Sequence, residues 1–265
     1  FFSSRRRHTR FRNVTGVQTC ALPILAPSTQ APSTRHSALS TRHSAPGVRH
    51  PFRSRLYAIL DTDLCAARGI VPVALLDAWL GAGIRLTQLR AKTMPSGAML
   101  ELADAMAARC RAAGATFIVN DRADIAAMCG ADGVHVGQED ISPAAVRRIF
   151  GPGAAPIIGL SPHPAAQLDA ASREPISYLA FGPVFSTTSK ERPDPVVGLD
   201  GVRLAAARAR EAGLPLVAIG GITLATAPDV IAAGADAVAV ISDLLVGAPG
   251  VRARAFLESV GALGL

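Results

Sequence analysis

From Leu56 onward, short apolar runs alternate with amphipathic segments along the chain. Most of these runs lack the polar alternation of a strand with one face in water, which is typical of parallel strands covered on both faces. The predicted strands are Leu56–Leu60, Arg85–Leu89, Thr116–Val119, Gly133–Val136, Pro156–Leu160, Tyr178–Phe181, Leu216–Ile219 and Ala237–Ile241.

Amphipathic segments between these strands predict helices, and glycine stands at several of their ends, where a left-handed cap is favoured. The predicted helices lie near 71–82, 96–113, 122–129, 142–149, 163–172, 200–212, 223–233 and 243–260. A strand followed by a helix, eight times in about 210 residues, predicts an α/β fold of the (β/α)₈ TIM-barrel type in one domain, residues 56–265. An open doubly wound sheet is the alternative, although no glycine-rich fingerprint follows Leu60, as it would in that fold.

Residues 1–55 differ in composition from the rest of the chain. They contain ten Arg and no Asp or Glu, and residues 27–46 form a crude repeat rich in Pro, Ser and Thr. Such a segment cannot bury enough apolar surface to fold, so we predict a disordered tail. Its Arg- and Ser-rich composition is also that of an organelle transit peptide, and residues 3–24 resemble translated sequencing-adapter sequence.

The chain carries a net charge of +7 and a pI near 10, but the basic excess belongs to this tail. Residues 56–265 hold 17 basic and 20 acidic residues, which argues against nucleic acid as a partner of the barrel. Four Cys without a CxxC pair argue against a disulfide framework or a zinc site and favour a reducing compartment, the cytoplasm. No membrane-spanning helix is predicted, because no uncharged apolar run reaches about 18 residues without Gly or Pro.

The segment 181–190 has an unusual composition for the end of a buried strand. The apolar run stops at Gly182-Pro183, and four consecutive hydroxyl side chains, Ser186 to Ser189, are followed by Lys190. Several neutral donors and one ammonium suit an anionic, oxygen-rich ligand. The alternative is a Ser/Thr-rich surface loop.

Polar residues also follow the other predicted strands, at the end of the barrel where active sites form. Gln88, Arg90 and Lys92 are spaced by two, so an extended chain presents them on one face. One neutral donor and two cations suit a diphosphate, and a salt-bridged strand end is the alternative.

Two carboxylates, Asp121 and Asp140, follow neighbouring predicted strands. Beside cations, they suit Mg²⁺ held by few protein ligands and by substrate phosphates. The alternative for Asp121 is a helix N-cap. Ser142 offers a cap of its own, which leaves the Asp140 carboxylate free, and Glu139 is expected to support the Asp140 turn.

Gly220-Gly221 and Ile241-Ser242 follow the last two predicted strands, where barrels of this type commonly bind a phosphate. His135 lies within a predicted strand and is read more readily as an interior histidine than as a catalytic base, and His163 is a weaker candidate still. One phosphate corner, together with cations and a metal beside a second substrate, suits displacement of pyrophosphate.

Seven motifs carry a resemblance to a known family: QLRAK (88–92), NDRADIA (120–126), GADGVHVGQEDI (130–141), GLSPH (159–163), FGPVFSTTSK (181–190), VAIGGI (217–222) and AVAVIS (237–242). Together they resemble thiamine-phosphate synthase (thiamin-phosphate pyrophosphorylase) from about Leu56 to Leu245. Departures are small: Ser186 stands where the family often has Pro, and 224–226 where it often has Asn.

The resemblance implies condensation of 4-amino-2-methyl-5-pyrimidinylmethyl diphosphate with a thiazole phosphate, yielding thiamine phosphate and pyrophosphate. It implies that the pyrimidine diphosphate is held by Gln88, Arg90, Lys92, Asn120, Ser161 and Lys190, of which Arg90, Ser161 and Lys190 are the predicted catalytic residues. It implies Mg²⁺ at Asp121 and Asp140, and thiazole-phosphate contacts from Thr187, Thr188, Ser189, Gly221, Ile241 and Ser242. The implied mechanism is dissociative: pyrophosphate leaves first, and the thiazole nitrogen then attacks.

Three alternatives stay open at the level of the sequence. A thiazole-tautomerase-like isomerase would need His135 as its acid or base and no diphosphate site. A thiamine- or phosphate-binding regulator would bind without turnover. An Arg-rich tail that binds nucleic acid would show steep salt dependence in the full-length chain.

Overall fold

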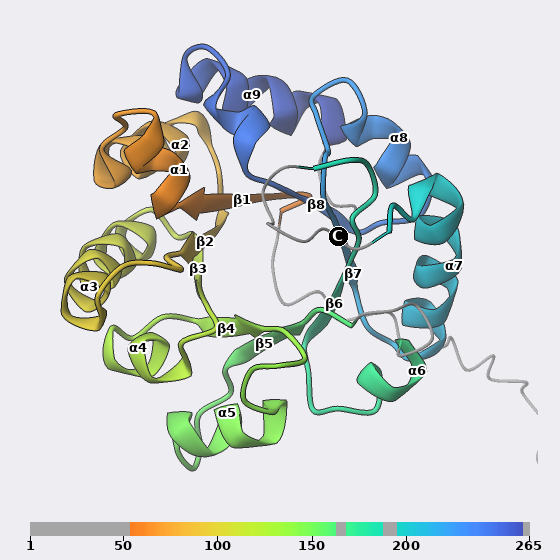
Figure 1. The fold of residues 1–265 in the computed structure, drawn as a ribbon, viewed down its shortest axis with the longest axis horizontal. Coiled ribbons are helices and arrows are strands. Elements are labelled where there is room, and N and C mark those ends of the chain that lie inside the picture. Colours follow the sequence, from red (N-terminus) through yellow and green to blue (C-terminus); the bar gives the residue numbers. More distant parts are fainter. Residues whose placement is uncertain (1–53, 163–167, 188–194, 262–265) are drawn as a thin grey trace, which may run out of the picture. The chain divides into compact units, whose positions relative to one another are not determined.

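The computed structural model describes residues 54–162, 168–187 and 195–261, all of which belong to one compact unit, Ser44–Leu265. Eight parallel strands form a closed barrel in sequence order, and the last strand pairs with the first (Figure 1). The predicted TIM barrel is therefore confirmed, and the open doubly wound sheet is wrong. The predicted tail lies almost entirely outside the described residues.

The strands are close to those predicted, and helices surround them on the outside (Figure 1). The strands are β1 (Leu56–Asp61), β2 (Leu86–Arg90), β3 (Thr116–Asn120), β4 (Gly133–Val136), β5 (Ile157–Leu160), β6 (Tyr178–Phe181), β7 (Leu216–Ile219) and β8 (Ala237–Val240). The helices are α1 (Thr62–Ala67), α2 (Pro72–Ala82), α3 (Ser96–Ala112), α4 (Ala123–Met128), α5 (Pro143–Phe150), α6 (Leu168–Ala171), α7 (Gly198–Glu211), α8 (Ala227–Ala232), the 3₁₀ helix η2 (Ser242–Leu245) and α9 (Pro249–Val260).

Two helical predictions differ from the structure. The predicted helix 243–260 is split into η2 and α9, because Gly247 takes a positive φ of 68° and Pro249 begins a new helix. An unpredicted helix, α1, follows β1 directly, and the Asp61 side chain caps it by accepting from the Leu64 N–H. This extra helix places Asp61 at the mouth of the barrel.

Both faces of the strands are buried, which accounts for the missing polar alternation. On β1, Leu56, Ala58 and Leu60 pack outward against the helices, whereas Tyr57 and Ile59 belong to a separate cluster. That second cluster fills the barrel interior with Tyr57, Ile59, Leu86, Ile118, Tyr178, Ala180, Val217, Ala237 and Ala239. The core is therefore layered as expected for parallel strands that pass between two apolar environments.

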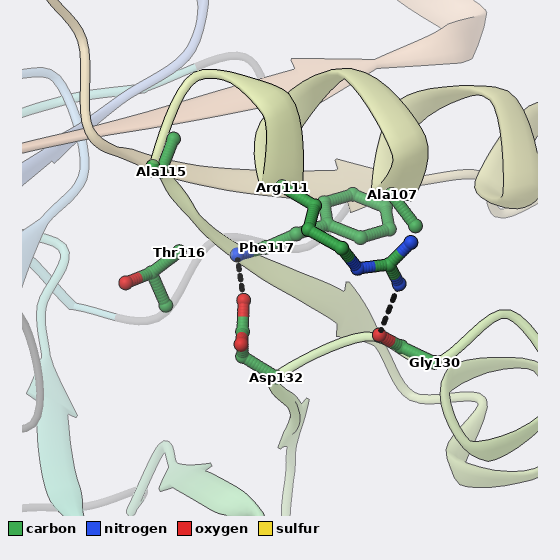
Figure 2. Close-up of a pocket in the computed structure, with 8 residues that line it drawn as sticks. Ala107, Arg111, Ala115, Thr116, Phe117, Gly130 and Asp132 are labelled. Atoms are coloured by element: carbon green, nitrogen blue, oxygen red, sulfur yellow. Dashed lines mark hydrogen bonds between the residues drawn. The ribbon is translucent and has the colours of Figure 1, made fainter.

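Aspartates secure the amino-terminal ends of two strands by the same contact. Asp132 exchanges two hydrogen bonds with the backbone of Phe117 at the start of β3, and its carboxylate accepts from the Phe117 N–H at 2.8 Å (Figure 2). Asp236 makes the same pair of bonds with Leu216 at the start of β7. Each aspartate follows a Gly-Ala pair, at Gly130 and Gly234.

The cavity of about 290 Å³ in Figure 2 lies at this amino-terminal end. Its polar groups are engaged locally: Arg111 donates to the Gly130 carbonyl, and Asp132 accepts from Phe117. In this fold the amino-terminal ends of the strands contribute to stability, and we assign the cavity no role in chemistry. Within the described residues, no helix has the length and apolar character needed to cross a membrane.

Candidate active site

A larger cavity, of about 620 Å³, opens at the carboxyl ends of the strands. Eleven of the predicted site residues line it: Gln88, Arg90, Lys92, Asn120, Asp121, Asp140, Ser161, Thr187, Gly221, Ile241 and Ser242. They come from segments spread over more than half of the chain. The predicted residues Thr188, Ser189 and Lys190, and His163, lie outside the described residues. The cavity thus gathers the described candidates in one place, while their individual roles stay predictions.

Arg90 is held at the rim of this cavity by Asp61. The two residues are register partners at the ends of β1 and β2, and the Arg90 guanidinium donates to the Asp61 carboxylate. Asp61 is 7% and Arg90 19% exposed, so water screens this ion pair only partly. The sequence reasoning missed Asp61, although a carboxylate directly after the first predicted strand was a usable signal.

Lys92 and Asp121 form a second ion pair, with 2.5 Å between the Lys92 Nζ and Asp121 Oδ2 atoms. Among the described residues, Asp121 is the one non-glycine residue with a positive φ, 61°. This left-handed conformation is tolerated by Asp, whose short side chain can bond locally. The Asp121 carboxylate does not cap α4, whose N-cap is Arg122, so the predicted N-cap alternative is wrong.

Asp140 lies beside Asp121. Burial raises the pKa of Asp121, the Lys92 ammonium lowers it, and the neighbouring Asp140 carboxylate raises it again. Asp140 is not wholly free as predicted, because its Oδ2 atom accepts from the Gly137 N–H at 2.7 Å. It therefore closes its own turn, the task that the sequence reasoning gave to Glu139. Ser142 caps α5 as predicted.

The acidic pair fits a divalent cation. Two adjacent carboxylates repel each other, and a cation between them would remove that repulsion. Across the described ranges, no cluster of three or more His, Cys, Asp and Glu side chains is arranged to hold a metal ion. Phosphate oxygens and water would have to complete the coordination, as Mg²⁺ commonly requires.

The floor of the cavity is a chain of side-chain hydrogen bonds. His135 Nε2 lies 2.8 Å from the Ser161 hydroxyl, and His135 Nδ1 lies 3.0 Å from the Tyr178 hydroxyl. The Tyr178 hydroxyl lies 3.1 Å from that of Tyr57, which accepts from Gln88 Nε2 at 2.7 Å. His135 lines the cavity, and both of its ring nitrogens are bonded, as expected of a satisfied interior histidine. The two tyrosines were missed because strand tyrosines resemble core residues.

Two glycines let the loop after β6 lie against the loop after β7. Gly220 and Gly221 have φ of 102° and 66°, and a Cβ atom on Gly221 would lie 2.5 Å from the Ser186 carbonyl oxygen. The Phe185 N–H donates to the Gly220 carbonyl at 3.0 Å. The glycines are therefore required for backbone contact, besides any contact with an anion.

The loop after β8 is fastened to the same region by Asp243. Its Oδ2 atom accepts from the Leu224 N–H at 2.8 Å and from Arg252 at 2.6 Å. Asp243 and Arg252 are 14% and 24% exposed. These bonds tie the start of η2 to the segment that follows Gly221 and to α9.

This fold and site define a class of protein: a barrel enzyme with cations, an acidic pair and glycine-rich loops around one cavity, as suits phosphorylated substrates. Residues 56–244 match the model of a family described as thiamine monophosphate synthase. The chain belongs to this family, and the predicted family and enzyme class are confirmed.

Individual relatives agree with this assignment. The thiamine-phosphate synthase of Koribacter versatilis is 44% identical over 206 residues, covering 77% of this chain and 94% of that protein. That of Laribacter hongkongensis is 44% identical over 188 residues, covering 71% and 85%. Among solved structures, thiamine phosphate pyrophosphorylase from Pyrococcus furiosus superposes with a TM-score of 0.68 at 30% identity, covering 78% of this chain and 95% of that one.

Proposed function

We propose that this chain condenses 4-amino-2-methyl-5-pyrimidinylmethyl diphosphate with 4-methyl-5-(2-phosphoethyl)thiazole, giving thiamine phosphate and pyrophosphate. The observation that carries the proposal is that one cavity brings together cations, an acidic pair and glycine-rich loops. Arg90, Lys92 and the Asp121–Asp140 pair line the barrel mouth at, or just after, the carboxyl ends of β2 to β4. The loops at Gly221 and Ser242 follow β7 and β8.

The diphosphate would lie against β2 and β3. Asp61 holds the Arg90 guanidinium at the rim, so this cation would be in place when the substrate arrives. The Lys92 ammonium is half exposed and forms an ion pair with Asp121. We propose that it turns to the diphosphate when the acidic pair is neutralised. Ser161 and Asn120 would donate from the cavity wall.

Asp121 and Asp140 would hold Mg²⁺ together with diphosphate oxygens. When bound, Mg²⁺ supplies positive charge to the departing pyrophosphate. The pKa of Asp121 is raised by burial first and by the neighbouring Asp140 carboxylate second, which supports this assignment because a bound cation would offset both effects. Metal and cations would therefore act where negative charge develops.

The reaction needs no general base. The bond between the pyrimidinylmethyl carbon and the diphosphate oxygen breaks, and its electron pair leaves with pyrophosphate. The thiazole nitrogen then gives its lone pair to the same carbon, so no proton is transferred. This agrees with a cavity in which the imidazole nitrogens of His135 already bond to Tyr178 and Ser161.

Lys190, Thr188 and Ser189 keep their predicted roles within this proposal. The described part of their loop reaches the cavity at Thr187, the residue before them. A hydroxyl-rich segment that ends in an ammonium would face the phosphate groups from β6. The cytoplasmic location is proposed on cysteine usage: the three described cysteines, Cys65, Cys110 and Cys129, are buried free thiols.

Pyrophosphate release from the full-length chain tests this function. Release should require both substrates and Mg²⁺, and EDTA should abolish it. Controls omit each substrate in turn, and circular dichroism verifies folding. A folded sample that releases no pyrophosphate contradicts the synthase activity. Conversion between thiazole isomers by that sample would instead support the tautomerase alternative, for which the position of His135 in the cavity is the favouring observation.

A further inference from the structure

A row of three register partners contributes to the cavity floor. His135 on β4 is paired with Gly159 on β5, and Gly159 is paired with Tyr178 on β6. With no side chain on the middle residue, the His135 and Tyr178 rings stack across it, with centroids 5.6 Å apart and an interplanar angle of 26°. The hydrogen bond between His135 and Tyr178 therefore crosses β5, which contributes no side chain to it.

Gly159 allows the His135 and Tyr178 rings to come close together. A Cβ atom at this position would lie 2.1 Å from Tyr178 Cζ and 2.4 Å from His135 Nδ1. Any side chain here would push apart the two rings, since real Cβ contacts are never this short. The sequence of β5 therefore makes the contact between His135 and Tyr178 possible.

The contact extends across the barrel. Tyr57 on β1 meets Tyr178 edge to face, with ring centroids 6.1 Å apart, and both tyrosines are almost wholly buried. Burial raises the pKa of both hydroxyls, so both keep their protons at neutral pH. In the chain Gln88–Tyr57–Tyr178–His135–Ser161, two neutral hydroxyls and the His135 imidazole therefore connect Gln88 to Ser161, and both end residues line the cavity.

The protons in such a chain have a preferred direction. Gln88 Nε2 donates to Tyr57, and each hydroxyl has one proton to pass on. In the head-to-tail order, Tyr57 donates to Tyr178, and Tyr178 donates to His135 Nδ1. His135 then carries its proton on Nε2 and donates to Ser161. Successive bonds in one direction polarise each other and strengthen the chain.

We propose that Tyr57 and Tyr178 are positioning residues that set the hydrogen-bonding polarity of Gln88 and Ser161. With Nε2 bonded to Tyr57, Gln88 presents its amide oxygen as an acceptor toward the cavity. With Oγ accepting from His135, Ser161 presents its proton as a donor. The two ends of one chain thus offer an acceptor and a donor to the same ligand.

This polarity matches the diphosphate substrate, and this part of the inference rests on the proposed function. The Gln88 oxygen would accept from an exocyclic amino group on the pyrimidine ring, and the Ser161 hydroxyl would donate to a diphosphate oxygen. An analogue that carries an oxo group in place of the amino group would set two acceptors against each other. The tyrosines would then contribute to substrate selection without touching the substrate.

The tautomer of His135 tests the chain independently of turnover. Nitrogen-15 spectra of histidine-labelled full-length chain, at about pH 8 to keep imidazole neutral, should show Nε2 protonated and Nδ1 as a hydrogen-bond acceptor. Loss of the signal in His135→Gln provides the assignment. In Tyr178→Phe the Nδ1 resonance should move toward that of a free acceptor. A proton on Nδ1 in the wild type would overturn the proposed direction.

Kinetics separate positioning from general destabilisation. Tyr178→Phe should lower kcat/KM for the pyrimidine diphosphate about ten-fold, the effect of one lost hydrogen bond in a buried chain. It should leave KM for the thiazole phosphate unchanged, and discrimination against the oxo analogue should fall. Thr87→Val is the matched control, because it removes a buried hydroxyl that faces Cys110 from the residue next to Gln88.

The control should lose stability without these kinetic changes. The positioning role would be overturned if wild type and Tyr178→Phe discriminated equally against the oxo analogue, or if Tyr178→Phe and Thr87→Val lost kcat/KM equally. Either result would leave the synthase activity in place. If the wild type releases no pyrophosphate, the proposed function fails, and the His135 tautomer alone decides whether the chain has the proposed direction.

Discussion

The Asp61 carboxylate binds the Arg90 guanidinium where two adjacent strands end, and the same carboxylate caps helix α1. One side chain thus links a cation that lines the cavity to the start of a helix. Asp61→Asn should keep most of the cap, since Asn is also a good N-cap residue, but lose the charge that orients Arg90.

We expect Asp61→Asn to lower kcat/KM for the pyrimidine diphosphate about ten-fold, because a buried charge-assisted bond is lost. Steady-state kinetics with each substrate varied in turn measure this effect. Asp77→Asn is the control, because Asp77 pairs with Arg109 in an exposed position far from the cavity. Similar kinetics for the two variants would contradict the positioning of Arg90 by Asp61.

Replacing either member of the acidic pair should remove the response to Mg²⁺. Asp121→Asn and Asp140→Asn should each lower turnover by orders of magnitude while the barrel remains folded, because these carboxylates act on developing charge. Mg²⁺ titrations followed by pyrophosphate release and by thermal unfolding measure both effects. Asp124→Asn, which breaks an exposed pair with Arg122, is the control and should respond to Mg²⁺ like the wild type.

Gly221→Ala should disrupt the loops after β6 and β7. The new Cβ atom would meet the Ser186 carbonyl at 2.5 Å, in addition to the cost of a positive φ. We expect KM for the thiazole phosphate to rise at least ten-fold, since this backbone holds the proposed phosphate site. Gly213→Ala has a similar φ of 69° with open space around it, and it isolates the conformational cost of roughly 1 kcal/mol. A thiazole-phosphate KM raised equally in both variants would contradict the loop contact.

The buried Cys65 thiol makes the stability of the fold depend on pH in the alkaline range. Burial, with a smaller contribution from Asp61, raises the pKa of the Cys65 thiol from 9.0 to about 11. The unfolded state loses this proton first, so the contribution is complete below pH 9 and is lost as the pH rises toward about 11. Urea unfolding over this interval should show a steeper loss of stability in wild type than in Cys65→Ala. Parallel curves would show that Cys65 does not contribute.

The barrel could be predicted from the sequence because most strands lack polar alternation, and because glycines mark the ends of several helices. Part of the cavity could be predicted because Gln88, Arg90 and Lys92 follow one another at spacings of two where the second strand ends. Such polar residues at a strand end have no packing role to explain them.

The supporting residues could not be predicted in the same way. Tyr57 and Tyr178 lie inside apolar strands, and nothing local distinguishes a tyrosine that bonds across the barrel from one that fills the core. Gly159 has an ordinary φ, so its role becomes visible only when the rings on both sides are placed. Asp61 could have been noticed as a carboxylate directly after the first strand, but its contacts depend on a helix that was not expected and on the pairing of β1 with β2. These residues act through register and closure, which the order of the chain alone does not reveal.

The central claim is that one cavity joins two phosphorylated substrates, and product stoichiometry tests it most directly. Mass spectrometry of a reaction of the full-length chain with both substrates and Mg²⁺ should find one thiamine phosphate for each pyrophosphate released. Asp121→Asn should form both products far more slowly than the wild type. Pyrophosphate without thiamine phosphate would indicate simple hydrolysis of the diphosphate and would contradict a synthase.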